Sequence, residues 1–88
     1  MEEPASLIQY PTDFPIKILG LNEAGFEAAI ADLLRLHAPD FDLASIEVRE
    51  SRGGRYLSIT ATINATSRSQ LDTIYRALTS HPMVRVVL

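Results

Sequence analysis

The chain has 88 residues, enough for one small domain, and its composition (47% hydrophobic, 22% charged) excludes a wholly disordered protein. It has no apolar run that could span a membrane, and the lack of cysteine excludes a disulfide scaffold, an iron–sulfur cluster and a cysteine nucleophile. A net charge of −3 disfavours a nucleic-acid-binding role, because phosphate contacts need a basic surface.

Residues 1–13 are predicted to be a tail, and residues 14–88 a single domain. The tail begins with two acids and contains two prolines, but apolar side chains such as Tyr10 predict that its second half docks on the domain. It lacks the features of a secretory signal, so we expect a cytoplasmic protein. The chain up to Asp42 carries a charge of −6 and the remainder +3. This asymmetry favours either two differently charged solvated faces or association through opposite charges.

A first strand is predicted over residues 14–20, because apolar and polar side chains alternate there. A helix follows, with Asn22 as a favourable N-cap, and ends before Pro39. His37 and the acids beyond it lack a recognised metal-ligand spacing, so no metal site is expected. The apolar side chains of this helix recur at the spacing of one helical stripe. The stripe consists of Phe26, Ala29, Ile30, Leu33, Leu34 and His37.

A hairpin is predicted around residues 52–55, where Gly53 and Gly54 can adopt the positive φ angles of a tight turn. Counting outward from this turn pairs apolar residues with apolar ones and polar residues with polar ones, as a correct register requires. The expected pairs are Arg49 with Ser58, Val48 with Ile59, Glu47 with Thr60 and Ile46 with Ala61.

A second helix is predicted after Ser67, because Ser67 and Gln70 have the spacing of a capping box. Its apolar stripe is Leu71, Ile74, Tyr75 and Leu78. The valine-rich residues 83–88 form a final strand. The order β-α-β-β-α-β predicts a ferredoxin-like α+β sandwich, in which a four-stranded antiparallel sheet carries both helices on one face.

The other face of this sheet is predicted to be open. A hydroxyl-rich face is normal for a solvated sheet, and a protein-contact surface is the functional alternative. An RNA-binding sheet would carry several stacking aromatic side chains, and Tyr56 stands nearly alone. We therefore expect neither a nucleic-acid nor a membrane partner. The candidate interaction residues on this face are Lys17, Arg49, Tyr56, Ser58 and Thr60.

The segment 20–26 joins the first strand to the first helix and contains two glycines. In the first turn of a helix, Gly25 costs about 0.5–1 kcal/mol relative to alanine unless the space is needed. Amides at a helix N-terminus can accept a carboxylate, which makes Gly20, Asn22 and Gly25 candidate ligand-binding residues. The structural alternative is a glycine that lets the helix pack closely on a neighbouring strand.

Several blocks of the sequence fit the pattern of one known family, namely residues 10–17, 37–39, 51–56, Ser58, 63–67, Gln70, Leu71, Ile74, Tyr75, Leu78, His81, Pro82, Val84, Val87 and Leu88. Together these positions resemble the YbeD-like family of small bacterial proteins over nearly the whole chain. The resemblance implies a sandwich similar to the ACT-type regulatory domains, a cytosolic protein without known catalytic activity, and a link to lipoate metabolism through genomic neighbourhood. Residues 20–26 also look like the ACT-type loop that binds an amino acid between subunits, although Asn22 stands where those domains usually have an acid.

No nucleophile, acid and base converge in this pattern, so we expect a protein that is not an enzyme and has no cofactor. The expected function is a regulatory or adaptor role through contact with an unidentified protein partner, with formation of a homodimer left open. The alternative is a sensing module that binds an amino acid or another small carboxylate at the first strand–helix loop.

Overall fold

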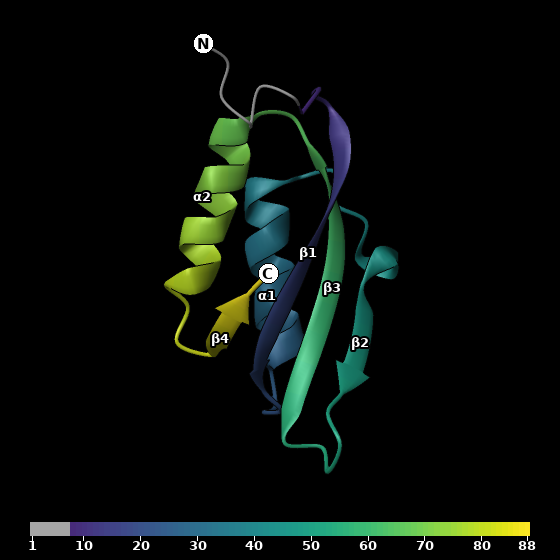
Figure 1. Ribbon diagram of the computed structural model, residues 1–88, viewed down its shortest axis with the longest axis vertical. Helices are drawn as coiled ribbons and strands as arrows, with labels where there is room; N and C mark the ends of the chain where they lie inside the picture. Colours follow the sequence, from purple (N-terminus) through teal and green to yellow (C-terminus); the bar gives the residue numbers. More distant parts are fainter. Residues whose placement is uncertain (1–7) are drawn as a thin grey trace.

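The computed structural model describes residues 8–88, which form a two-layer sandwich of one sheet and two helices (Figure 1). The sheet is antiparallel with the strand order β2-β3-β1-β4, and both helices lie on the same face. The predicted ferredoxin-like fold is confirmed. Within the described range, no helix has the length and apolar character needed to cross a membrane. The elements are β1 (Thr12–Leu21), α1 (Phe26–His37), a short 3-10 helix (Leu43–Ser45), β2 (Glu47–Glu50), β3 (Tyr56–Ala65), α2 (Arg68–Thr79) and β4 (Val84–Val87).

The central strands β1 and β3 form the sheet side of the hydrophobic core. They pair over their whole length, and alternate side chains of each strand point toward the helices and are buried there. β1 begins two residues before the predicted strand, and Tyr10 packs against the core. Residues 1–7 of the predicted tail lie outside the described residues. The fully buried large side chains are Phe26, Ile16, Ile18, Ile30, Leu34, Ile59, Ile63, Ile74 and Leu78.

The β2–β3 hairpin has the predicted register from Glu47 onward, with Glu47 opposite Thr60. Both turn glycines have positive φ angles, 84° and 75°, as the turn prediction requires. The ladder does not extend to the predicted pair of Ile46 with Ala61. Ile46 instead caps the 3-10 helix, where its N–H donates to the Leu43 carbonyl at 3.3 Å.

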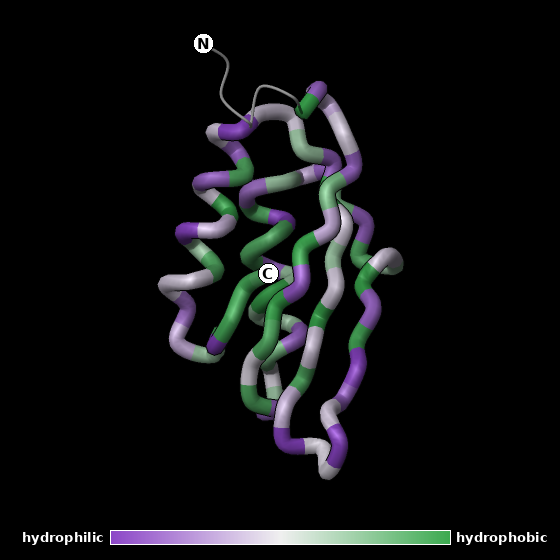
Figure 2. The backbone as a smooth tube through the Cα atoms, in the orientation of Figure 1, coloured by the Kyte–Doolittle hydropathy of each residue, from purple (hydrophilic) through white to green (hydrophobic). Residues whose placement is uncertain are grey.

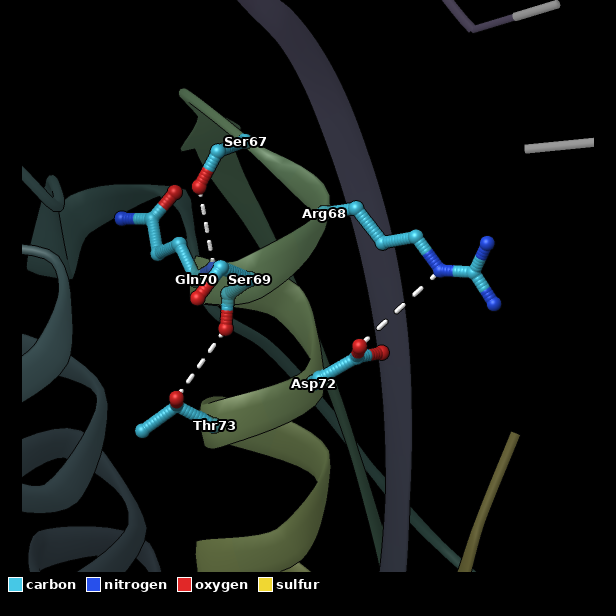
Figure 3. Close-up of polar contacts among 6 residues, drawn as sticks. All are labelled: Ser67, Arg68, Ser69, Gln70, Asp72 and Thr73. Atoms are coloured by element: carbon cyan, nitrogen blue, oxygen red, sulfur yellow. Dashed lines mark hydrogen bonds and ion pairs between the residues drawn. The ribbon is translucent and has the colours of Figure 1, made fainter. Parts of the chain in front are cut away.

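Helix α2 begins with the predicted side-chain cap. The Ser67 hydroxyl accepts from the Gln70 N–H at 3.0 Å (Figure 3). The return bond differs by one residue, because the Gln70 Oε1 accepts from the Thr66 N–H at 2.7 Å. The Gln70 Nε2 donates to the His37 carbonyl at 3.1 Å, which ties the start of α2 to the end of α1.

The prediction that Asn22 caps helix α1 is wrong. The helix begins at Phe26, and its N-cap is Gly25, which has a φ of 87° and makes no side-chain cap bond. The Asn22 side chain donates instead to the Gly54 carbonyl at 2.9 Å, on the hairpin loop. The Asn22 side chain is thus bonded to Gly54, 32 residues away, and does not cap the helix that follows it.

Strand β4 forms one edge of the sheet and pairs with β1. Leu88 continues this pairing, because its N–H and carbonyl both bond to Lys17, at 2.8 and 3.2 Å. A register shift beside Leu19 places Val86 opposite Leu19. Cross-strand neighbours share a face, so Val86 and Leu88 lie on the open face of the sheet.

Candidate functional site

Gly20, the first of the candidate ligand residues, belongs to the core. It is buried at the end of β1, beside the register shift. A Cβ atom placed there would lie 2.6 Å from a ring atom of Phe26 and would also press on the Met83 carbonyl. Close approach of helix and strand thus requires glycine at this position, and no ligand could reach it.

Asn22 and Gly25 lie at the surface and shape the loop. Besides its side-chain bond to Gly54, Asn22 donates its N–H to the Arg55 carbonyl at 2.9 Å, so the first loop is fastened to the hairpin loop. Gly25 has open space where a Cβ would stand. Close packing therefore does not explain Gly25, and its positive φ does.

A groove of about 510 Å³ runs between α1 and the segment that leads into β2, and Asn22 and Gly25 are on its rim. Among the described residues, its lining carries the carboxylates Glu23 and Glu27 and neither lysine nor arginine. Two like charges disfavour an anion at this place. The groove therefore suits a neutral or cationic ligand better than the carboxylate expected from the sequence. Its apolar and small lining residues are Ala28, Ala31, Leu43, Ile46 and Leu57.

The open face of the sheet is ordered in cross-strand rows. One row runs from Glu47 on β2 through Thr60 to Lys17. The next row runs from Arg49 through Ser58 to Leu19. Glu47 and Arg49 form no ion pair with any residue of the described range, so their charges face solvent.

The five candidate interaction residues all lie on this face. Four of them line one depression of about 260 Å³ together with Glu47 and Val48. Tyr56, the fifth, lines a neighbouring hollow of about 120 Å³ with Leu19 and Arg49. The Arg55 guanidinium lies 5.7 Å from the centre of the Tyr56 ring. The four that share the first depression are Lys17, Arg49, Ser58 and Thr60.

Three apolar residues of the open face are absent from the sequence-based prediction. Leu19 follows Lys17 by two positions, so strand alternation alone could have found it. Val86 and Leu88 are 45% and 66% exposed. Their orientation depends on the register shift in the β1–β4 pairing, and no sequence pattern indicates such a shift. Figure 2 shows the apolar character of β4, in contrast to the more hydrophilic β2.

Burial raises the pKa of the Tyr75 hydroxyl, which donates to the Leu88 carbonyl at 3.4 Å. Within residues 8–88, no group of three histidine, aspartate or glutamate side chains is placed to hold a metal ion. The surface features that stand out are a groove and an open sheet face, and both are suited to binding.

Comparison with known sequences gives matches over nearly the whole chain. A family described as "Protein of unknown function (DUF493)" matches residues 5–88. A UPF0250 protein of Nitrosomonas europaea is 55% identical over 83 residues, which cover 94% of this chain and 95% of that protein. A UPF0250 protein of a Janthinobacterium is 52% identical over 88 residues, covering 100% and 97% of the two chains.

Comparison with solved structures supports the fold. The solution structure of protein HP0495 from H. pylori matches with a TM-score of 0.75 at 16% identity, covering 92% of this chain and 85% of that one. The ACT domain from GTP pyrophosphokinase of Chlorobium tepidum matches with a TM-score of 0.59 at 21% identity, covering 88% and 97%. At these identities the likeness concerns the fold alone.

Proposed function

This chain belongs to the DUF493 family, of which the YbeD-like proteins are part, and we propose that it is a non-catalytic regulatory or adaptor protein of the bacterial cytosol. It acts by contact with a protein partner through the open face of its sheet. Shared fold with an ACT domain supports a regulatory role by analogy. The link to lipoate metabolism that the family resemblance implies makes a partner from that metabolism the first to test.

The observation that carries this proposal is the composition of the open face. Tyr56, Val86 and Leu88 are each more than 40% exposed there, and Lys17 and Arg49 lie beside them. Aromatic residues and arginine are enriched in protein interfaces, and exposed apolar area next to charge is typical of binding surfaces. The partner that fits is a protein segment with apolar side chains and acidic residues.

Site-specific photo-crosslinking in the bacterial cell tests this proposal. The variant Tyr56→p-benzoylphenylalanine places a photoreactive ring on the open face, and Thr73→p-benzoylphenylalanine places the same ring on the exposed surface of α2. We expect a discrete crosslinked protein from position 56 and none from position 73. Mass spectrometry then identifies the crosslinked protein.

The binding affinity of charge variants for the purified partner completes the test. Lys17→Glu should weaken its binding at least about tenfold, because one charge reversal replaces attraction by repulsion toward an acidic segment. The matched variant Arg76→Glu, on the helical layer, should bind as the wild type does. Equal crosslinking from both positions, or equal affinities of the two charge variants, would contradict the use of this face.

A second candidate function is the sensing of a small ligand in the groove beside α1, which is favoured by its size of about 510 Å³. A thermal-shift panel of amino acids, lipoate, octanoate and amines tests it. A ligand at about 100 times its dissociation constant stabilises a protein by about 2.7 kcal/mol. Ala28→Trp, which fills the groove, should abolish any such shift. A flat panel, or a shift that survives this variant, counts against a ligand in this groove.

A further inference from the structure

The open face of the sheet carries a connected apolar surface. Leu19 lines a hollow together with Tyr56 on one side, and Val86 lies directly opposite Leu19 on the other. Leu88 lies beyond Val86, where it pairs with Lys17. Tyr56, Val86 and Leu88 are 42%, 45% and 66% exposed. These three residues and Leu19 are here called the apolar patch, which crosses β3, β1 and the edge formed by β4 and Leu88.

The charged groups next to the apolar patch are cationic. Lys17 is the cross-strand neighbour of Leu88, because the two residues exchange both backbone hydrogen bonds. Arg49 lines the same hollow as Tyr56. The Arg55 guanidinium lies 5.7 Å from the centre of the Tyr56 ring. Three positive side chains therefore border the apolar patch.

The acids of this region lie farther from the apolar patch. Glu47 is in the row of Lys17 but two strands away on β2, about 10 Å at the usual strand spacing. Asp13 precedes Lys17 by four residues on β1, about 13 Å. Glu50 borders the hollow, but it pairs with the buried Leu57 and so belongs to the helical face. The charge beside the patch is thus complementary to acidic groups of a partner.

Backbone hydrogen bonding decides which kind of element can cover this patch. A strand laid flat on an apolar surface would leave its own N–H and C=O groups without hydrogen-bond partners. A strand added at the β4 edge would satisfy those groups, but it would leave Tyr56 uncovered, two strands away on β3. A helix satisfies its backbone groups internally and presents a stripe of apolar side chains.

The dimensions of the patch suit one helix. From β3 to β4 it spans two strand spacings, about 10 Å, and a helix with its side chains is about 10–12 Å across. Along the strands it extends from the row of Tyr56 and Leu21 to the row of Leu88 and Lys17. That is about 13 Å, or between two and three helical turns. Since α1 and α2 cover the other face (Figure 1), a third helix here would give a three-layer arrangement.

A second copy of this chain suits the patch less well. Its own open face would bring Lys17 and Arg49 against the same cations, and like charges across an interface are unfavourable. The apolar stripes of its helices α1 and α2 are already packed in its own core. The complementary occupant is therefore an acidic helix from another protein.

We propose that the partner binds this chain through an amphipathic helix, which lies over the open face as a third layer. Aliphatic side chains of that helix contact the apolar patch, and its glutamate or aspartate side chains lie beside Lys17 and Arg49. This inference rests on the proposed function, because it takes the open face as the contact surface and adds the form and charge of what binds there. A contact of two to three turns is small, so the complex is weak.

Stapled peptides test the form and the charge of this helix separately. The probe has about 15 residues, with leucine at the spacing of one helical stripe, glutamate on both flanks and a hydrocarbon crosslink on its outer side that keeps it helical. One control has lysine in place of every glutamate. The other has the same composition in strict alternation and no crosslink. In NMR titrations of the isotope-labelled protein to about 1 mM peptide, both controls should bind at least about tenfold more weakly than the acidic helix.

Two valines of similar exposure provide matched variants. Val86 is 45% exposed within the apolar patch, whereas Val48 is 42% exposed on the other edge strand and pairs with the buried Ile59, which places it on the helical face. Val86→Asp should weaken binding of the acidic helix at least about tenfold, because it places a carboxylate among apolar side chains and repels the glutamates. Val48→Asp should bind as the wild type does. Thermal unfolding checks each variant, and Leu88→Asp, at a more exposed position, replaces Val86→Asp where that variant is unfolded.

The outcomes separate this inference from the proposed function. Equal binding of the acidic and basic helices, tighter binding of the alternating peptide, or binding of none of them would overturn the inference. Equal losses from Val86→Asp and Val48→Asp would do the same. A discrete crosslink from position 56 together with no preference for the acidic helix would leave the proposed function standing and overturn only the helical form of the partner. Amide shifts confined to Leu19, Ser58, Val86 and their neighbours would support it.

Discussion

The two helices of this sandwich begin in different ways. Helix α1 starts after Gly25, a residue with positive φ and no side-chain cap, and the strand before it has the buried Gly20 as its last residue but one. Helix α2 starts after Ser67, whose hydroxyl accepts the Gln70 N–H (Figure 3). The start of α1, here called the first entrance, depends on the absence of side-chain atoms. The start of α2, the second entrance, depends on hydrogen bonds that side chains make.

This difference determines how each entrance responds to substitution. An added atom at the first entrance meets packed neighbours or a strained backbone, and both costs are steric. A removed atom at the second entrance leaves one backbone N–H without its acceptor, at a cost of about 1 kcal/mol. The following substitutions measure this contrast, in order of decreasing effect on stability.

Gly20→Ala should have the largest effect. The added Cβ would stand 2.6 Å from the Phe26 ring and against the Met83 backbone, so either the helix or β4 must move. Overpacking of this kind costs about 1–3 kcal/mol, and a backbone neighbour places the change at the upper end. For a domain of this size we expect the melting temperature to fall by about 10–20 °C in calorimetry.

Gly20→Ala in a Phe26→Leu background is the control for this prediction. The smaller side chain gives back part of the space, so the two substitutions together should cost less than the sum of their separate effects. Additive effects would show that contact with the ring is not the cause.

Gly25→Ala should have an intermediate effect of about 1–2 kcal/mol, because a Cβ is disfavoured at positive φ although nothing crowds it here. Gly25→Asn should cost less, since asparagine tolerates the left-handed region better than alanine. Urea denaturation of the three proteins gives the comparison. Equal losses for alanine and asparagine would contradict a backbone origin.

The first entrance also shows where sequence reasoning reaches its limit. Asn22 is a favourable N-cap by residue type, yet its side chain bonds to Gly54, 32 positions along the chain. Local sequence patterns do not contain that partner. Ser67 and Gln70, by contrast, lie three residues apart, and the predicted bond from the Gln70 N–H to the Ser67 hydroxyl is confirmed. The return bond of the Gln70 side chain differs from the predicted capping box, because its donor is the Thr66 N–H.

The same distinction holds for the sheet. The hairpin register and the outward positions of Lys17 and Arg49 follow from strict alternation, which sequence reasoning captures. Val86 and Leu88 reach the open face because of an irregularity in the β1–β4 pairing. No sequence pattern indicates this irregularity, so the exposure of Val86 and Leu88 on the open face could not be predicted, whereas that of Leu19 follows from strand alternation.

Ser67→Ala, at the second entrance, should cost about 1 kcal/mol through loss of the cap bond to the Gln70 N–H. Ser69→Ala is the matched control, because in the contact with Thr73 it is the Ser69 backbone carbonyl that accepts the bond. Calorimetry should show a decrease of about 4–8 °C for the first variant and little change for the second. Similar decreases for both would show that general helix propensity, and not the cap, is the cause.

The smallest effect concerns the body of the two helices and shows only in alkali. Their eighth residues, Leu33 and Tyr75, both pack against the core, but only Tyr75 carries a titratable group. Burial raises the Tyr75 pKa in the folded state above the unfolded value of about 10. The folded state thus holds this proton more tightly. The contribution of the protonated Tyr75 to stability is complete below about pH 10 and is lost as pH rises through the folded pKa.

Tyr75→Phe should unfold at nearly the same urea concentration as the wild type at neutral pH and should lose less stability above about pH 10. Tyr56→Phe retains Tyr75 and should keep the wild-type alkaline loss, so parallel pH profiles for all three proteins would show that Tyr75 contributes nothing to it.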